Sequence, residues 1–404
     1  MKTVSGGVCA AKGYKAGGVH CGIRRNPGKK DLALIVSECA ANAAAVYTTN
    51  LVKGAPIVVD QKHLADGKAQ AVICNSGNAN TCNADGIEIA EGMAALVEKH
   101  TGIAANDVVV ASTGVIGEPL SLTPIEKGMD SLVASLSSDG SLDACHAIMT
   151  TDTVPKEIAV EFTLGGKVCR MGGIAKGSGM IHPNMATTLT FITTDADISA
   201  EMLQRALSDN VKVTLNRASV DGDTSTNDMV CVMASGTAGN PTVAAEDADF
   251  EAFSNALYNI LLNLARMMAK DGEGATKLIE CAVTGAADEK TAETVAKSVI
   301  CSSLLKSMIF GEDANAGRIY CAVGYSDADF DISKVDIDMS SKGGSIALGR
   351  QGCVMEFDEE VAKQVLAEDE IQIIISLSEG SGTAVCWGCD LTYDYVKING
   401  DYRS

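Results

Sequence analysis

Short runs of apolar residues alternate along this chain with longer segments in which apolar residues recur at helical spacing. Two runs, 71–74 and 108–110, predict buried strands that end in glycine-containing turns. Between them, apolar positions within 89–97 recur every three or four residues and predict a helix that begins after Asp85 and ends at Gly102. The pattern is typical of the α/β class, in which strands and helices alternate.

The second half of the chain shows one long apolar stripe and then a more strand-rich pattern. Apolar positions within 250–268 predict a helix that packs on a sheet and ends at Gly272, and a further helix is expected over 295–304. Strands are expected at residues 318–325, 344–348, 370–376 and 383–396. We therefore expect a main α/β domain over 1–280 and a smaller C-terminal α/β domain over 281–404, although no Pro- or Ser-rich linker marks the boundary.

Composition and charge narrow the class of protein. The chain has 404 residues, of which 46% are hydrophobic and 21% charged, so it can bury a sizeable core and is not a disordered chain. Its formal net charge is −20. Because that charge repels phosphate backbones and anionic membrane surfaces, we expect neither nucleic acid nor a membrane as a partner.

The 14 cysteines are scattered through the chain, and no stretch approaches the roughly 18 apolar residues of a membrane span. The first residues also lack the apolar run of a secretory segment, so unpaired thiols and a cytoplasmic location are expected. One close pair, Cys386 and Cys389, forms a lone CxxC inside an expected strand. Without a second pair or nearby histidines it indicates two ordinary thiols, and we expect no metal site. A thiol- or metal-binding protein without catalytic activity is the weaker rival interpretation.

Several standard enzyme fingerprints are missing from the sequence. There is no GxGxxG after a strand, no GxxxxGK[ST], no HExxH and no GxSxG. The five histidines share no metal-ligand spacing. A dinucleotide oxidoreductase, a P-loop NTPase, a zincin and a typical α/β-hydrolase therefore lose their main sequence support.

The richest block of small and polar residues runs from Lys176 to Ala196, where a Gly/Pro/Asn loop enters an alternating strand that begins at Thr187. A threonine at the start of a strand is compatible with simple β-propensity. It is also compatible with self-cleavage: attack of the Thr187 hydroxyl on the carbonyl of Ala186, followed by hydrolysis, would free the α-amine of Thr187. Such an amine titrates near 7.7–8.0 and can act as the base for the hydroxyl of the same residue.

This block resembles the K-G-x-G-M-I-x-P-N-M-A-T segment of the ornithine acetyltransferase (glutamate N-acetyltransferase) family, self-cleaving enzymes of arginine biosynthesis. The resemblance extends over nearly the whole chain. It includes the blocks GYKAGGVHCGI (13–23), TTN (48–50), NSGNAN (75–80), STGVIG (112–117), MTTDTVPK (149–156), VDGDTSTND (220–228), KDGEG (270–274) and YVKINGDYRS (395–404). We identify the chain as a member of this family.

The resemblance implies a set of functional residues. It makes Thr187 the nucleophile and, through its freed amine, the base, with Ala186–Thr187 the bond that is cut. It places the oxyanion hole at Thr113 and Gly114. Substrate contacts are then expected from Thr150, Lys176, Thr187, Glu273, Asn399 and Ser404. Lys176 and Glu273 have the opposite charges that a zwitterionic substrate needs, and the C-terminal tail is expected to return to the site.

The resemblance also implies a fold and an activity. The fold is a layered sandwich of sheets covered by helices, similar in architecture to N-terminal-nucleophile hydrolases but with its own connectivity. Two intertwined fragments of 186 and 218 residues, assembled as α2β2, are expected. The activity is ping-pong transfer of acetyl from N-acetyl-L-ornithine to L-glutamate through acetyl-Thr187, without a metal or a bound cofactor.

Three points stay open. Some members of the family also use acetyl-CoA to acetylate glutamate, so acetyl-CoA remains a candidate co-substrate, although the sequence has no recognisable phosphate-binding loop. An N-terminal-nucleophile aminopeptidase or amidase, which transfers the acyl group to water, is the alternative enzyme. His182 stands where the family usually has a small residue, and it either tunes cleavage and specificity or is a tolerated loop residue.

Overall fold

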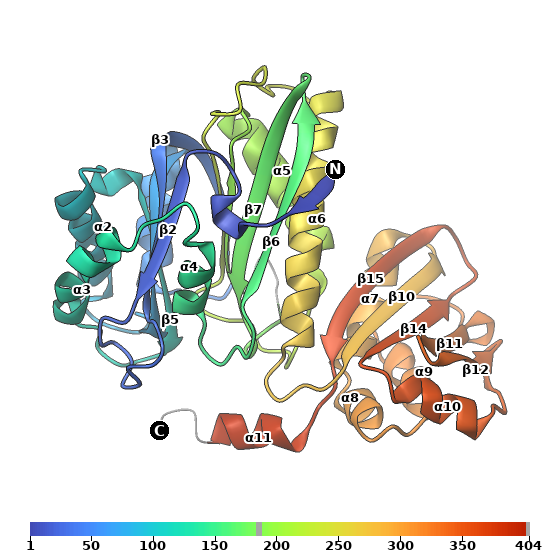
Figure 1. Cartoon of the computed structure of the whole chain (residues 1–404). Coiled ribbons are helices and arrows are strands. Elements are labelled where there is room, and N and C mark those ends of the chain that lie inside the picture. The colour runs from blue at the N-terminus through green and yellow to red at the C-terminus, as the bar shows by residue number, and fades with distance from the viewer. Residues whose placement is uncertain (183–187, 401–404) are drawn as a thin grey trace. The chain divides into compact units, whose positions relative to one another are not determined.

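The computed structural model describes residues 1–182 and 188–400, which divide into two compact units. Unit 1 contains the described residues of 1–177, 183–216 and 224–264, and unit 2 contains 178–182, 217–223 and those from 265 onward. Each unit combines a sheet with helices (Figure 1). The predicted α/β class, with sheets covered by helices, is confirmed.

Unit 1 is built on one nine-stranded sheet. Its strands are β1 (Lys2–Val4), β2 (Tyr14–Val19), β3 (Leu32–Tyr47), β4 (Lys68–Asn78), β5 (Val108–Val115), β6 (Lys156–Leu164), β7 (Lys167–Lys176), β8 (Leu189–Thr194) and β9 (Met229–Ala234). The order is β1-β6-β7-β8-β9-β3-β4-β5, and β2 also pairs with β3. The pairing of β3 with β4 has a register shift between Val36 and Ala41. The first part of β3 also pairs with β2, and its last part, from Asn42, pairs with β9. This long irregular strand joins one part of the sheet, formed by β2, β4 and β5, to the other part, formed by β9, β8, β7, β6 and β1.

Helices cover this sheet on more than one side. They are α1 (Ala55–His63), α2 (Gly86–Thr101), α3 (Leu122–Ala134), α4 (Ser141–Ile148), α5 (Ala200–Val213) and α6 (Ala248–Lys270). Residues of α1, α2 and α3 share one apolar cluster with β3, β4 and β5, and α2 and α3 lie side by side (Figure 1). The apolar residues of α4 share a second cluster with strands from both parts of the sheet. This second cluster is the interior of the layered architecture.

Unit 2 is built on a six-stranded sheet of order β13-β12-β11-β14-β10-β15. Its strands are β10 (Leu278–Ala286), β11 (Asp336–Ser341), β12 (Gly344–Arg350), β13 (Cys353–Val354), β14 (Glu370–Ser376) and β15 (Gly382–Cys389). Its helices are α7 (Glu289–Cys301), α8 (Ser303–Phe310), α9 (Ala316–Gly324), α10 (Glu359–Leu366) and α11 (Tyr393–Gly400). Residues of α7–α10 and of the sheet form one buried apolar cluster.

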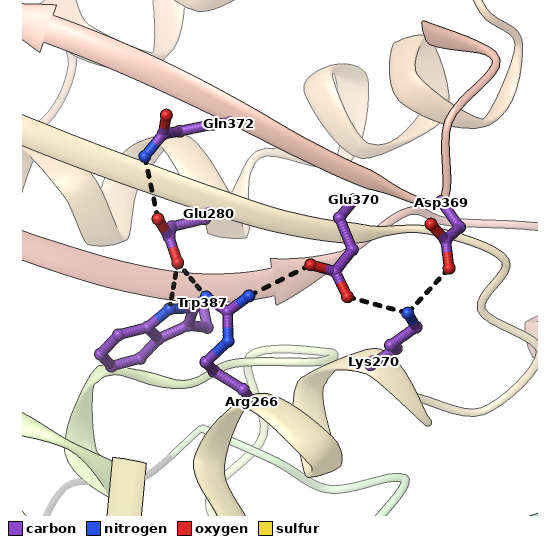
Figure 2. A network of polar contacts seen from close by, with 7 residues as sticks. All are labelled: Arg266, Lys270, Glu280, Asp369, Glu370, Gln372 and Trp387. Carbon is purple, nitrogen blue, oxygen red and sulfur yellow. Dashed lines mark hydrogen bonds and ion pairs between the residues drawn. The ribbon is translucent and has the colours of Figure 1, made fainter. Parts of the chain in front are cut away.

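The last crossing between the units falls inside α6, between Leu264 and Ala265, whereas the sequence placed a domain boundary near residue 280. A network of charges shown in Figure 2 ties the last turns of α6 to the sheet of unit 2. Arg266 forms ion pairs with Glu280 and, at 3.2 Å, with Glu370. Lys270 contacts Asp369 at 2.8 Å and Glu370 at 2.9 Å.

Local predictions met mixed outcomes. The helix expected between Asp85 and Gly102 is α2, and the strand expected over 370–376 is β14. The strand expected over 318–325 is wrong, because Asn315 caps a helix there, α9, by accepting from the Arg318 N–H. The strand expected over 383–396 ends at Cys389 and is followed by α11, and the helix expected over 295–304 is interrupted at Ser302 between α7 and α8.

None of the helices in the described ranges combines the length and apolar character that a membrane crossing requires. The 14 cysteines are free thiols, and Cys386 and Cys389 are buried in β15. Burial raises the pKa of Cys386 to about 12 and also raises that of Cys389, so both thiols are protonated and inert at neutral pH. Within residues 1–182 and 188–400, no group of three His, Cys, Asp or Glu side chains is arranged to hold a metal ion.

Candidate functional site

The end of β5 has a backbone that only glycine can adopt. Gly114 has φ +132°, and a Cβ at this position would lie 2.3 Å from the carbonyl carbon of Gly77 on the neighbouring strand β4. The two parallel strands therefore approach closely just where Thr113 and Gly114 end the buried part of β5. A hydroxyl and a backbone N–H at such a turn are suitable donors to an oxyanion.

Lys176, the last residue of β7, contacts this turn. Its Nζ donates to the Oγ1 of Thr113 at 3.2 Å. A threonine hydroxyl that accepts from an ammonium still has its own O–H to donate elsewhere. Burial lowers the pKa of Lys176, while the negative charge of Asp152 opposes that effect. The structure thus brings together Thr113, Gly114 and Lys176, three of the residues expected from the sequence.

A buried ion pair that sequence reasoning missed supports Lys176. Asp152 and Lys156 have no exposed side-chain surface and contact each other at 2.7 Å. Asp152 also accepts from the backbone N–H of Gly177 at 2.7 Å and that of Thr150 at 3.0 Å. Burial by itself would raise the pKa of Asp152, but the charges of Lys156 and Lys176 outweigh it and hold the pKa at about 2. Asp152 is therefore ionised at neutral pH, and it holds the backbone in place at Thr150 and at Gly177.

Asp228 is a second carboxyl near Lys176, and its pKa is shifted in the opposite direction from that of Asp152. It is buried directly before β9, and burial raises its pKa well above the ordinary value despite hydrogen bonds from Ser225 and the charge of Lys176. Within the described residues, its Oδ2 has no hydrogen-bond partner. The pKa of Asp228 is thus raised while that of Asp152 is lowered, and carboxyls whose pKa values are pushed apart are a feature of reaction centres.

Two of the expected substrate contacts, Glu273 and Asn399, lie in unit 2. Glu273 is buried, and its carboxylate accepts from the Nδ2 of Asn399 at 2.7 Å. Its backbone N–H donates to the carbonyl of Ser178 at 2.9 Å. A Cβ on Gly179 would lie 2.4 Å from the Glu273 carboxyl group, so a larger residue there would displace the carboxylate from its present position. Glu273 and Asn399 thus form one anionic group of unit 2.

The predicted site residues Ala186, Thr187 and Ser404 lie outside the described residues, so their assignments stay predictions. Thr188 follows Thr187 in the sequence, and its carbonyl accepts from the Met229 N–H at 2.8 Å. The strand that follows, β8, is buried at all six positions, so the alternating pattern expected there is wrong: β7 and β9 enclose it on both edges.

His182 belongs to unit 2 and is half-buried. Its Nδ1 lies 3.1 Å from the Oγ of Ser219. Burial, followed by the charge of Lys297, lowers the pKa of His182, so the ring is neutral at pH 7. A neutral imidazole held by a serine is compatible with both interpretations of His182.

Asp152, Lys156 and Asp228 are the functional candidates that sequence reasoning missed. A signal was present for the first two, because an acid and a base four residues apart lie within the MTTDTVPK block. For Asp228 the signal was only its place in the VDGDTSTND block. Neither pattern reveals that all three interact with Lys176, since that depends on pairing between distant strands.

The structure defines an α/β protein in which a threonine hydroxyl and a glycine N–H lie together at the end of a buried strand, beside a buried lysine. The ArgJ family profile matches residues 15–404. The chain is 51% identical over its full length, and over the full length of the relative, to the arginine biosynthesis bifunctional protein ArgJ of Caldanaerobacter subterraneus subsp. tengcongensis. The chain belongs to the ArgJ family, as the resemblance indicated.

Two solved structures are also similar to the chain. One is an arginine biosynthesis bifunctional protein ArgJ from Bacillus halodurans, with 49% identity, a TM-score of 0.49 and coverage of 52% of this chain and 96% of that one. The other is an ornithine acetyltransferase from Mycobacterium tuberculosis complexed with ornithine, with 38% identity, a TM-score of 0.41 and coverage of 46% of this chain and 99% of that one.

Proposed function

We propose that this chain is a self-processing acetyltransferase of arginine biosynthesis, which moves acetyl from N-acetyl-L-ornithine to L-glutamate through an ester on Thr187. The observation that carries the proposal is the contact between Lys176 and Thr113 beside Gly114, in a chain that belongs to the ArgJ family. In this proposal the turn supplies two donors to an oxyanion, the Thr113 hydroxyl and the Gly114 N–H. Because the Thr113 oxygen accepts from Lys176, its O–H is left to donate to the oxyanion.

In the proposed reaction, the Thr187 hydroxyl attacks the acetyl carbonyl of N-acetylornithine while the Thr187 amine takes the hydroxyl proton. The Thr113 hydroxyl and the Gly114 N–H donate to the oxyanion that develops. The amine then returns the proton to the leaving nitrogen, which gives acetyl-Thr187 and free ornithine. Attack by the glutamate amine on this ester repeats the steps in reverse and yields N-acetylglutamate.

The nucleophile is made by cleavage of the Ala186–Thr187 bond. The Thr187 hydroxyl attacks the Ala186 carbonyl, and the acyl group shifts from nitrogen to oxygen, so that the amide becomes an ester and the Thr187 amine is freed. Water then hydrolyses the ester, which releases the Ala186 carboxylate and restores the Thr187 hydroxyl. The products are fragments of 186 and 218 residues, which stay together and assemble as α2β2. Family membership supports this step, as does the charged Asp152, which holds the backbone N–H of Gly177 in the block that leads to the cleaved bond.

Substrate recognition follows from the charges. Lys176, with Thr150, suits the carboxylate of the amino acid, and Glu273, which Asn399 holds in place, suits the second ammonium of ornithine. Ser404 completes the set by family resemblance. The cytoplasm, where these amino acids are made, is the proposed location.

The test is a transfer assay with N-acetylornithine labelled in its acetyl group, with and without glutamate. We expect labelled N-acetylglutamate from the wild type and none from Thr187→Ala, while the neighbouring Thr188→Ala serves as the matched control and stays active. Labelled acetate formed at the same rate without glutamate would contradict the proposal and support the amidase alternative.

A further inference from the structure

Two short segments of unit 2 lie against each other, and one of them comes shortly before the bond that is expected to be cut. Residues 178–182, the leading segment, end four residues before Ala186. Residues 217–223, the supporting segment, contact the leading segment through a series of hydrogen bonds. Because a chain of four residues spans no more than about 14 Å, the position of the leading segment restricts where the Ala186 carbonyl can lie.

The centre of this contact is the carboxylate of Asp221. Its Oδ2 accepts from the backbone N–H of Met180 at 2.7 Å, and its Oδ1 accepts from that of Ile181 at 2.9 Å. The Tyr395 hydroxyl also donates to Oδ2, at 3.2 Å. Next to Asp221, the Val220 N–H donates to the Ile181 carbonyl at 2.7 Å. One carboxylate thus binds two consecutive N–H groups of the leading segment and uses both of its oxygens to do so.

Met180 has a backbone conformation that needs support from its surroundings. Its φ is +55°, in the left-handed region that residues with a side chain seldom adopt. The Met180 side chain is exposed, so packing of that side chain contributes little to holding the conformation. Such a conformation persists where the surrounding contacts fix it, and the hydrogen bond from the Met180 N–H to Asp221 is such a contact.

The supporting segment is itself fixed to the sheet of unit 2. The Ser219 N–H donates to the Trp387 carbonyl of β15 at 2.8 Å. The buried ammonium of Lys306 donates to the Val220 carbonyl at 2.7 Å. Asp221 therefore follows two residues whose backbone is bound on both sides, and it holds the leading segment from a fixed base.

We propose that Asp221 is a positioning residue for self-cleavage, which holds the leading segment so that the Thr187 hydroxyl can reach the Ala186 carbonyl. Such an attack requires reacting atoms about 3–3.5 Å apart in a suitable orientation, and a freely moving backbone would seldom present that arrangement. The inference rests on the proposed function, because cleavage of the Ala186–Thr187 bond is part of it. The bonds formed and broken are those of the proposed cleavage, in which Asp221 exchanges no proton.

The test follows self-cleavage of full-length chains after cell-free translation is stopped, with samples taken over time and separated on denaturing gels. Asp221→Asn leaves an amide, which can accept with only one of its two polar atoms. We expect it to slow the appearance of the two fragments at least about tenfold. The matched control, Asp223→Asn, removes the same charge from an exposed side chain of the same segment and should be cut at the wild-type rate. Asp221→Glu keeps both acceptors and should be cut faster than Asp221→Asn.

One further readout separates a positioning role from a purely structural one. In the Thr187→Ala background, where no cleavage is expected, the added Asp221→Asn substitution should leave a single cooperative thermal transition. Loss of that transition would overturn the proposal, because Asp221 would then be needed for the fold itself.

The outcomes also separate this proposal from the proposed function. An Asp221→Asn chain cut at the wild-type rate, or an Asp223→Asn chain slowed as much as Asp221→Asn, would overturn the role of Asp221. An Asp221→Glu chain as slow as Asp221→Asn would do the same. A wild-type chain that stays uncut would instead overturn the proposed self-cleavage.

Discussion

Replacement of Asp152 by Asn tests the buried charge that supports Lys176. The Asp152 and Lys156 side chains are fully buried and 2.7 Å apart, and the pKa of Asp152 is about 2 instead of 3.8. At about 1.4 kcal/mol for each pH unit, that difference corresponds to roughly 2–3 kcal/mol of stability from the ionised carboxylate. Loss of the carboxylate also removes the negative charge that faces the buried Lys156 ammonium, and breaking a buried ion pair in this way typically costs about 3–5 kcal/mol. We therefore expect Asp152→Asn to lower the free energy of unfolding by about 3 kcal/mol.

The direction of the pH dependence follows from the depressed pKa. Asp152 takes up a proton near pH 3.8 in the unfolded chain but only near pH 2 in the folded one. Its contribution to stability is therefore complete above about pH 4 and is lost as the pH falls toward 2. Asp152→Asn removes that part of the acid dependence.

The assay is urea unfolding at pH 7 and pH 3, followed by circular dichroism. Asp209→Asn is the matched control, because Asp209 forms an exposed i,i+4 ion pair with Arg205 and its loss should change stability by less than about 1 kcal/mol. A double variant, Asp152→Asn with Lys156→Met, should regain part of the loss, since it leaves no buried charge unpaired. An Asp152→Asn protein as stable as the Asp209→Asn control at pH 7 would refute the reasoning.

The remaining predictions concern Thr113, Gly114 and Asp228. Thr113→Ala should keep the fold and lose about 2–4 kcal/mol of transition-state stabilisation, seen as a fall of about 30- to 1,000-fold in kcat at unchanged melting temperature; an unchanged rate would remove Thr113 from the oxyanion hole. Gly114→Ala should lower the melting temperature more than Gly117→Ala, because both have positive φ but only Gly114 would bring a Cβ against Gly77, and equal losses would show that the close approach does not matter. Asp228 is expected to be protonated when folded but ionised when unfolded, so wild-type stability should fall relative to Asp228→Asn as pH rises from about 4, and parallel pH profiles would contradict the raised pKa.

The sequence was sufficient to predict a helix or strand where the residues of that element alone determine its structure. The α2 helix was predicted between Asp85 and Gly102 because its cap positions and apolar stripe agree, and β14 was predicted because every second side chain is apolar. The α9 helix was missed because its apolar residues Ile319 and Val323 were assigned to a strand, while the cap at Asn315 was overlooked. The end of β15 was missed for a similar reason: the strand stops at Cys389, where Asp390 turns to accept from Thr276 and Lys277.

The site was only partly predictable, because its geometry depends on contacts between distant strands. Thr113 and Lys176 were named from the resemblance, but their contact joins β5 to β7. The opposite pKa shifts of Asp152 and Asp228 depend on which partners the fold places around each carboxyl, and sequence spacing contains no such information. The ion pairs at the end of α6 likewise join residues as distant in the sequence as Arg266 and Glu370.

The most direct test of the account is the intact mass of the purified protein under denaturing conditions, with sequencing of any new N-terminus. The account predicts two fragments, of 186 and 218 residues, the second beginning at Thr187, and a single uncut chain for Thr187→Ala. A single uncut wild-type chain that still transfers acetyl to glutamate, or a cut Thr187→Ala chain, would contradict the claim that Thr187 is the nucleophile made by self-cleavage.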